Sequence, residues 1–262
     1  MTVLLLSTLH DPEGRLLPLI QRLGAADDTL GAAWAKTRHN YADLLCVASR
    51  AIDARSNAAL EATGWPVVVQ SDEPADRGLW NTVRRGLDRG TDFIHFCDLD
   101  RFVHWLLRYP DELAGLPAVW ERADLTMLVR SPRAFATHPP CQTATEGIAN
   151  RVIAHRLGVP EADALSGSYV WSRRAAEAIL AFPGPRDLRF YAVGAVAPFR
   201  AGCSVGYHVV EGLEWETPDQ YPDEIASLGY ATWLAQFESP AQWRHRAEMA
   251  RLWVEVALMD LP

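Results

Sequence analysis

The sequence predicts an α/β fold, with a mostly parallel central sheet flanked by helices and a helix at the C-terminus. Short apolar runs rich in Val, Leu and Ile alternate with stretches whose apolar residues recur at helical spacing. Such continuous apolar runs are typical of parallel strands that are covered on both faces. A chain of 262 residues with 49% hydrophobic residues is also long enough for one large core. No linker divides the chain, so we expect a single domain over residues 1–262.

The first half of the chain contains five predicted strands. The apolar runs that predict them lie at residues 2–7, 43–49, 65–70, 92–98 and 124–130. Helical spacing followed by a glycine predicts helices at residues 14–24, 56–64 and 78–90. This alternation predicts successive β-α units.

After residue 130 the pattern changes. We expect, in order, a proline-rich loop at 131–142, a helix at 143–158, a strand at 164–172, helices at 173–182 and about 187–201, and a strand at 204–210. An acidic loop follows at 211–224. The closing helix is predicted to have Ser239 as N-cap, Pro240 at its first position, and Trp243, Ala247, Ala250 and Val254 on one face.

Composition excludes several classes of protein. The net charge of -8 leaves no basic field to attract nucleic acid or an anionic membrane surface, so we expect no nucleic-acid partner. The N-terminal apolar stretch is only about five residues long, whereas a membrane span needs about 20. We therefore expect no membrane span and a soluble, cytoplasmic protein. The oligomeric state is left open, a homodimer included.

The stretch TDFIHFCDLDRFVHW, residues 91–105, combines an apolar strand with two acids at its end. In an open α/β sheet, ligands bind beyond the carboxyl ends of the strands, which is where Asp98 and Asp100 would lie. This Asp-x-Asp motif offers hard oxygen ligands to Mg²⁺ or Mn²⁺, whose shell diphosphate oxygens could complete. Alternatively, Asp98 caps the next helix and Asp100 pairs with Arg101.

The order of strands leading to GTDFIHFCDLD resembles the nucleotide-binding half of the GT-A glycosyltransferases. The stretch ALSGSYVWSRRA is similar to the Leu-Ala-Gly-Glu region of glucosyl- and mannosyl-transferases that act on glycerate or phosphoglycerate, although Ser168 replaces their usual Glu. The resemblance implies a GT-A-like (Rossmann-like) domain with a nucleotide-binding half, 1–130, and an acceptor-binding half, 131–262. It also implies a metal-dependent enzyme that moves a sugar from a nucleotide-diphosphate sugar to a hydroxyl of a small-molecule or glycan acceptor.

The resemblance implies that short polar side chains after the first and third strands border the nucleotide. The candidates are Ser7, Thr8, Asp11, Ser71 and Asp72. Asp11 could instead begin a turn with the proline that follows it.

Three arginines lie shortly before the acid pair, and arginine can hold a phosphate by two parallel hydrogen bonds. Arg77 is the preferred phosphate contact. Arg84 and Arg85 are adjacent on a predicted helix and point about 100° apart, so at most one should face the site. We assign Arg84 to that role.

The resemblance to retaining members of the family implies a third protein ligand to the metal, after the last strand. His208, Glu214 and Glu216 are candidates; His208 is favoured, and the two glutamates are the harder alternatives. Asp100 would also take part in catalysis, because the cation that it helps to hold assists departure of the nucleoside diphosphate. His104, about one turn beyond the motif, could support the metal ligands from behind.

His138 and Glu146 are candidates to orient the acceptor hydroxyl, His138 from the loop 131–142, which we expect to cover the bound donor. Glu146 also suits the first turn of a helix with Thr143 as its N-cap. Trp80 and Trp105 could stack on a sugar or a base, or belong to the core.

Retention of configuration is favoured, because an inverting enzyme needs a general base and the segment around 187–201 offers only Asp187. One alternative is a nucleotidyltransferase, which normally has a glycine-rich basic loop after the first strand; STLHDPEGR has one Gly and one Arg. The other is a non-catalytic GT-A-like binding protein, whose interaction surface the ten tryptophans would suit.

Overall fold

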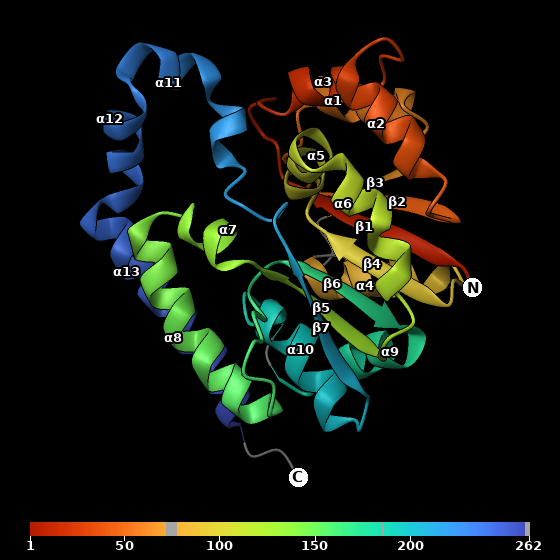
Figure 1. Cartoon of the computed structure of the whole chain (residues 1–262), viewed down its shortest axis with the longest axis vertical. Helices are drawn as coiled ribbons and strands as arrows, with labels where there is room; N and C mark the ends of the chain where they lie inside the picture. Colours follow the sequence, from red (N-terminus) through yellow and green to blue (C-terminus); the bar gives the residue numbers. More distant parts are fainter. Residues whose placement is uncertain (72–77, 185, 260–262) are drawn as a thin grey trace.

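The computed structural model describes residues 1–71, 78–184 and 186–259, and it confirms the α/β class (Figure 1). Within these residues the sheet has seven strands in the order β3-β2-β1-β4-β6-β5-β7. Their bounds are β1 Val3–Leu9, β2 Asp43–Ala48, β3 Val67–Val69, β4 Phe93–Cys97, β5 Leu125–Arg130, β6 Ser168–Ser172 and β7 Val205–Val210. Asp72 and Arg77 lie outside the described residues.

The sheet is mostly parallel. The four strands β1 to β4 pair in parallel, as do β5 and β7, whereas β6 runs antiparallel to both β4 and β5. Because parallel strands end at the same edge, the residues after β1, β2, β3 and β4 are brought together there. The strands β6 and β7 come from the second half of the chain, so both halves contribute to one sheet.

Helices cover both faces of this sheet. In the first half they are α1 Leu17–Leu23, α2 Thr29–Arg38, α3 Ala54–Ala62, α4 Gly78–Asp88, α5 Leu99–Arg108, α6 Pro110–Gly115 and the 3₁₀ turn η2 Leu116–Val119. In the second half they are α7 Pro132–Ala136, α8 Pro140–Leu157, α9 Arg173–Ala181, α10 Phe190–Arg200, η3 Thr217–Gln220, α11 Pro222–Leu228, α12 Tyr230–Leu234, η4 Ala235–Glu238 and α13 Pro240–Leu258. No helix in the described ranges has both the length and the apolar character that crossing a membrane requires.

The core has two layers because side chains of a strand alternate between the faces of the sheet. In β1, Leu4 and Leu6 belong to one core cluster with residues of α4, α8, α9, α10 and α13, while Val3 and Leu5 belong to another with residues of α1, α2, α3, α5 and α6. Figure 1 shows α8 and α13 side by side at one flank of the molecule.

The expected loop at 131–142 is wrong. Residues 132–136 form α7, and α8 begins at Pro140. Ser131 caps α7, since its hydroxyl accepts a hydrogen bond of 3.0 Å from the amide of Ala134. Each helix has a proline in its first turn, where the missing N–H costs nothing, so the prolines start helices here instead of stiffening a loop.

The closing helix was predicted correctly in its start, and its predicted face is right for Ala250 and Val254, which pack into the core, but wrong for Trp243 and Ala247, which are exposed. The hydroxyl of Ser239 caps α13 through the amide of Gln242, as expected. The buried residues, however, are Ala250, Trp253, Val256 and Ala257. Trp243 is 40% exposed, because the first turns of α13 extend past the core that its later turns cover.

Candidate functional site

A cleft of about 430 Å³ lies at the edge of the sheet where β1, β2, β3 and β4 end. It is lined at the strand ends by Thr8, Leu9, His10, Val47, Ser49 and Gln70, at the start of α4 by Gly78 and Leu79, and elsewhere by Asp98, Asp100, Arg101, Tyr191 and Glu216. Three carboxylates and one guanidinium thus face a single cavity. Its volume is in the range of small-molecule sites, about 300–1,000 Å³.

Asp98 directly follows β4 and lies at the N-cap position of α5, but its side chain makes no capping hydrogen bond. Its carboxylate instead accepts hydrogen bonds from the hydroxyl of Thr8 and, at 3.3 Å, from that of Tyr191. Burial raises the pKa of Asp98; the charge of Arg101 opposes this shift and that of Asp100 adds to it. The capping alternative is therefore wrong for Asp98, whose carboxylate is turned to the cleft.

Asp100 lies in the first turn of α5 and also faces the cleft. Its Oδ1 accepts from the adjacent amide of Arg101 at 2.9 Å, and its Oδ2 accepts from Nε2 of Gln220 at 3.3 Å. The guanidinium of Arg101 pairs with another residue, Glu216, with 3.8 Å between Nε and Oε1.

Glu216 comes from the segment between β7 and η3 and is only 8% exposed. Within the described residues its Oε2 is buried without a hydrogen-bond donor. Burial raises the pKa of Glu216, Arg101 lowers it, and the neighbouring charge of Asp100 raises it further. A buried carboxylate oxygen without a partner is costly, and a cation in the cleft would supply one.

Arg101 was not identified as a site residue from the sequence. Its guanidinium donates to the carbonyl of Ser166 and lies against Gly167, where an added Cβ would clash with Nη1. Burial alone would lower the pKa of Arg101, but Glu216 and Asp98 raise it well above its usual value, so the side chain stays charged. A signal did exist: a base in the first turn of a helix opposes the helix dipole and needs another reason to be there.

The acidic set fits a divalent cation. The cleft brings together three carboxylates, those of Asp98, Asp100 and Glu216, and one guanidinium, that of Arg101. Carboxylate oxygens are the ligands that Mg²⁺ and Mn²⁺ prefer. Among the described residues, however, no three His, Cys, Asp or Glu side chains are grouped closely enough to hold a metal ion, and this set is no exception. These carboxylates would therefore bind a cation only together with oxygens of the ligand.

Two predicted nucleotide contacts in the first strand and its loop lie elsewhere. Thr8 lines the cleft, but Ser7 is adjacent in β1 and so points to the opposite face, into the core. Asp11 does not line the cleft and is 3% exposed; its carboxylate accepts from the amide of Arg15 at 2.7 Å and the hydroxyl of Ser56 at 2.7 Å. Asp11 therefore has the alternative role, in a turn, and its hydrogen bond with Ser56 connects this loop to α3.

Arg84 and Ser71 are both exposed and are not among the residues that line the cleft. Arg84 follows Trp80 and Val83, which pack into the core from α4, so it projects to the solvent side of that helix. Its assignment as the arginine that faces the site is wrong.

His208 does not line the cleft, contrary to the favoured assignment. It lies inside the edge strand β7, paired with Leu128, and not beyond the end of the strand. Burial lowers the pKa of His208, as does the nearby Arg122. Of the alternatives, Glu216 lines the cleft, whereas Glu214 belongs to a neighbouring group of polar residues.

His138 and Glu146 are buried around Arg130 and do not line the cleft. Arg130 Nη2 donates to Glu146 at 2.7 Å, its Nε to Asp163 at 2.6 Å, and its Nη1 lies 3.3 Å from Nε2 of His138. Burial lowers the pKa of His138, and Arg130 lowers it further. Because α8 starts at Pro140, Glu146 is also beyond the first turn, so neither reading of it was right.

Several other residues of the predicted site belong to the core. Trp80 and Trp105 are 3% and 0% exposed, which confirms the core alternative for both. Ser168 is buried in β6, where its hydroxyl donates to the carbonyl of Phe96 at 3.1 Å. Conversely, the sequence did not indicate Tyr191, on α10, or the pair His10 and Ser49, whose Nδ1 and Oγ lie 2.8 Å apart.

No protein-family model matches the sequence, and no curated protein sequence matches it. Among solved structures, the chain is similar to glucosyl-3-phosphoglycerate synthase from Mycobacterium tuberculosis in complex with Mn²⁺, UDP-glucose and phosphoglyceric acid, with 19% identity, 91% of this chain and 80% of that chain covered, and a TM-score of 0.49. It is also similar to CMP:2-keto-3-deoxy-manno-octonic acid synthetase complexed with CTP, with 12% identity, 91% and 99% coverage, and a TM-score of 0.49. A third similar structure is that of a putative nucleotide-diphospho-sugar transferase from Desulfovibrio desulfuricans G20, with 11% identity, 97% of this chain and 99% of that chain covered, and a TM-score of 0.41. At these identities the similarity concerns the fold and assigns no activity to this chain.

Proposed function

We propose that the protein is a metal-dependent glycosyltransferase that moves a sugar from a nucleotide-diphosphate sugar to an acceptor hydroxyl. The observation that carries this proposal is the set of Asp98, Asp100 and Glu216 around one cleft, with an unpartnered buried oxygen on Glu216 among the described contacts. The cleft lies beyond the carboxyl ends of parallel strands, where open α/β sheets bind their ligands.

In this proposal Asp98, Asp100 and Glu216 hold Mg²⁺ or Mn²⁺, with Glu216 in place of His208. When bound, the cation neutralises the charge that develops on the departing diphosphate. Thr8 and Tyr191 fix the carboxylate of Asp98, and Gln220 fixes that of Asp100, so these ligands are oriented before the donor arrives.

The guanidinium of Arg101 supplies a second, permanent charge for the diphosphate. Among the described residues only its Nη1 has a hydrogen-bond partner, the carbonyl of Ser166, and the side chain lines the cleft. Its remaining donors suit phosphate oxygens. The polar groups of His10, Ser49 and Gln70 would then border the base and ribose. Asp72 and Arg77 keep the roles that the sequence predicts for them, in the segment before α4.

Transfer with retention of configuration at the sugar remains the favoured mechanism. The carboxylates that line the described cleft are Asp98, Asp100 and Glu216, and all three are assigned to the cation. None is left to act as the general base that an inverting enzyme requires.

The nucleotidyltransferase alternative is less well supported. Such an enzyme would need a basic loop after β1 to hold the triphosphate, and the arginine of this loop is Arg15. Its Nε and Nη1 pair with Glu13 at 2.7 Å and Glu224 at 2.8 Å, and it does not line the cleft.

A thermal-shift screen of nucleoside diphosphates and nucleotide sugars, with Mn²⁺ or with EDTA, tests the proposal. A ligand at about 100 times its Kd stabilises the folded protein by about 2.7 kcal/mol. For a chain of this size each kcal/mol raises Tm by about 2–4 °C, so we expect a rise of about 5–11 °C that EDTA removes.

Two variants make the screen specific for the assigned ligands. Glu216→Gln keeps the side-chain volume but removes the charge, so it should abolish the Mn²⁺-dependent part of the shift. His208→Gln is the matched control and should keep it. The reverse pattern would restore His208 as the ligand, and the absence of any nucleotide-dependent shift in the wild type would refute the proposed function.

A further inference from the structure

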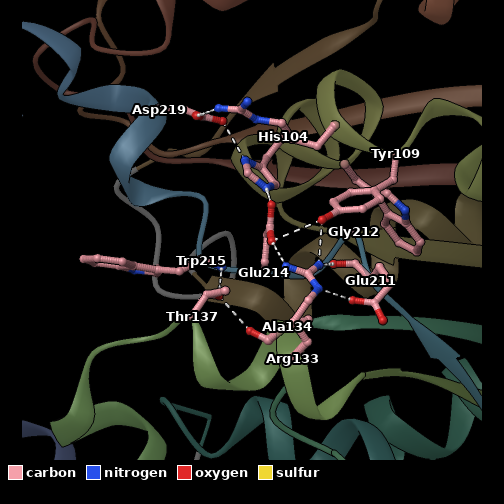
Figure 2. Close-up of polar contacts among 12 residues, drawn as sticks. His104, Tyr109, Arg133, Ala134, Thr137, Glu211, Gly212, Glu214, Trp215 and Asp219 are labelled. Carbon is pink, nitrogen blue, oxygen red and sulfur yellow. Dashed lines mark hydrogen bonds and ion pairs between the residues drawn. The ribbon is translucent and has the colours of Figure 1, made fainter. Parts of the chain in front are cut away.

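A second group of polar side chains lies beside the cleft and connects α5 to the acidic segment, which we define as residues 211–220 (Figure 2). At its centre is His104 of α5, which is 4% exposed. Its Nδ1 lies 2.6 Å from Oδ2 of Asp219, and its Nε2 lies 3.2 Å from Oε1 of Glu214. One buried imidazole thus joins two residues of the acidic segment.

Both ring nitrogens of His104 face carboxylate oxygens. A neutral imidazole has a single N–H and could donate to one of them, whereas an imidazolium donates to both. Burial alone would lower the pKa of His104, but Asp219, Glu216 and Glu214 raise it above its usual value, which favours the imidazolium between the two acids. Each acid has a second cationic partner, since Arg133 lies 2.6 Å from Glu214 and Arg108 lies 3.3 Å from Asp219.

Two residues of the acidic segment approach the acid pair: Glu216, which lines the cleft, and Gln220, which donates to Asp100. Glu216 stands between Glu214 and Asp219 in sequence, and Gln220 follows Asp219 directly. Asp100 and His104 are four residues apart on α5, so these two side chains lie on the same side of that helix. The contacts of His104 therefore fix the segment in register with the acid pair.

Other attachments hold the middle and the beginning of the acidic segment. In the middle, the hydroxyl of Thr137 accepts from the amide of Trp215 at 2.8 Å, and Trp215 packs against Trp233. The carboxylate of Glu112 accepts from the amides of Glu211 at 2.8 Å and Gly212 at 2.9 Å. Arg133 pairs with Glu211 at 2.7 Å, but its side chain is 50% exposed. Exposed ion pairs contribute little. Thr137 holds the residue before Glu216, whereas the buried contacts of His104 hold both Glu214 and Asp219, on either side of Glu216.

We propose that His104 is a positioning residue: it clamps the acidic segment to α5, so that Glu216 and Gln220 stay at the acid pair. This inference rests on the proposed function, in which Glu216 binds the cation.

Hydrogen–deuterium exchange tests the clamp without reference to any activity. In His104→Gln we expect exchange in residues 211–220 to become at least tenfold faster, while exchange in β1 and β4 is unchanged. Asp219→Asn, which weakens the other side of the same contact, should act in the same direction. Unchanged exchange in the segment for both folded variants would overturn the proposal.

A double-mutant cycle on Mn²⁺ affinity then separates positioning from a general loss of structure. Free Mn²⁺ is measured by its electron paramagnetic resonance signal in the presence of UDP and, in parallel, GDP. His104→Gln should weaken Mn²⁺ binding about tenfold in the wild-type background but less than twofold in Glu216→Gln, because the ligand that it positions is already lost. Arg133→Gln, which touches Glu214 from the exposed side, is the matched control and should change the affinity less than twofold.

Equal weakening by His104→Gln in both backgrounds, or an effect of Arg133→Gln as large as that of His104→Gln, would overturn the positioning role. If the wild-type protein binds no Mn²⁺ with either nucleotide, the proposed function fails. The clamp is then decided by the exchange measurement alone.

Discussion

The position of Arg101 depends on a glycine distant in sequence. Gly167 has a φ of +76°, which side-chain-bearing residues rarely adopt, and its missing Cβ leaves the space that the guanidinium fills. The guanidinium in turn faces Asp98 and Glu216 in the cleft. The need for glycine at position 167 is thus linked to the placement of the positive charge of Arg101 in the cleft.

Gly167→Ala should therefore do more than strain the backbone. Strain at positive φ costs about 1–3 kcal/mol, and displacement of Arg101 should also weaken nucleoside diphosphate binding. Gly64→Ala is the matched control, because Gly64 has a φ of +78° but nothing within 4 Å of an added Cβ. Urea unfolding and diphosphate titration of both variants provide the measurement. This account of Arg101 would be contradicted if Gly167→Ala and Gly64→Ala lost the same stability and Gly167→Ala still bound nucleoside diphosphate as the wild type does.

The buried pair of Arg130 and Asp163 gives a prediction about pH. Burial alone would raise the pKa of Asp163, but Arg130 and the hydrogen bonds from Arg130 and Asn150 lower it below its usual value. The folded pKa is thus below the unfolded one, about 3.9. The pair therefore contributes stability above about pH 4, and this contribution is lost as pH falls through the lowered pKa.

We expect Asp163→Asn to be less stable than the wild type at pH 7 and the difference to shrink below about pH 4. Unfolding free energies from pH 3 to 7 test this expectation. A difference that stays constant over the whole range would show that the charge of Asp163 is not responsible.

At the scale of elements, the sequence predicted strands better than it predicted which face of a helix is buried. Strands such as β2 and β5 are almost wholly buried, so their apolar runs stand out and their bounds were found within a residue or two. In α13 the apolar residues are spread around the helix, and only the packing against α8 and α10 selects Ala250 and Trp253. That choice depends on partners far away in the sequence.

The buried face of α13 can be tested with two tryptophans of the same helix. Trp253 is 2% exposed and its indole N–H donates to the carbonyl of Leu188 at 2.8 Å, so Trp253→Ala should cost about 3–5 kcal/mol. Trp243→Ala should change the free energy of unfolding by less than about 1 kcal/mol, because that side chain is 40% exposed. Similar losses from both substitutions would contradict the assigned face.

At the scale of the whole molecule, the strand order determines which predicted site residues meet. Of the residues that the sequence indicated, Asp98, Asp100 and Thr8 line one cleft, because they follow or end strands whose carboxyl ends share one edge. The sequence favoured His208 over Glu216, although the predicted strand 204–210 already contained His208. The structure keeps His208 inside β7, whereas Glu216 lines the cleft. His138 and Glu146 looked accessible in a loop and at a helix start, but α7 and α8 bury both around Arg130.

The central claim is that the cation held by Asp98, Asp100 and Glu216 supports transfer from a nucleotide-diphosphate sugar. The most direct test is to incubate the protein with a panel of nucleotide sugars and acceptors and to measure release of nucleoside diphosphate. We predict release from at least one donor, reduced at least about 100-fold by EDTA or by Asp100→Asn, since either removes about 2.7 kcal/mol or more of transition-state stabilisation. Release that neither EDTA nor Asp100→Asn affects would contradict the account, as would release of pyrophosphate from a nucleoside triphosphate in place of transfer.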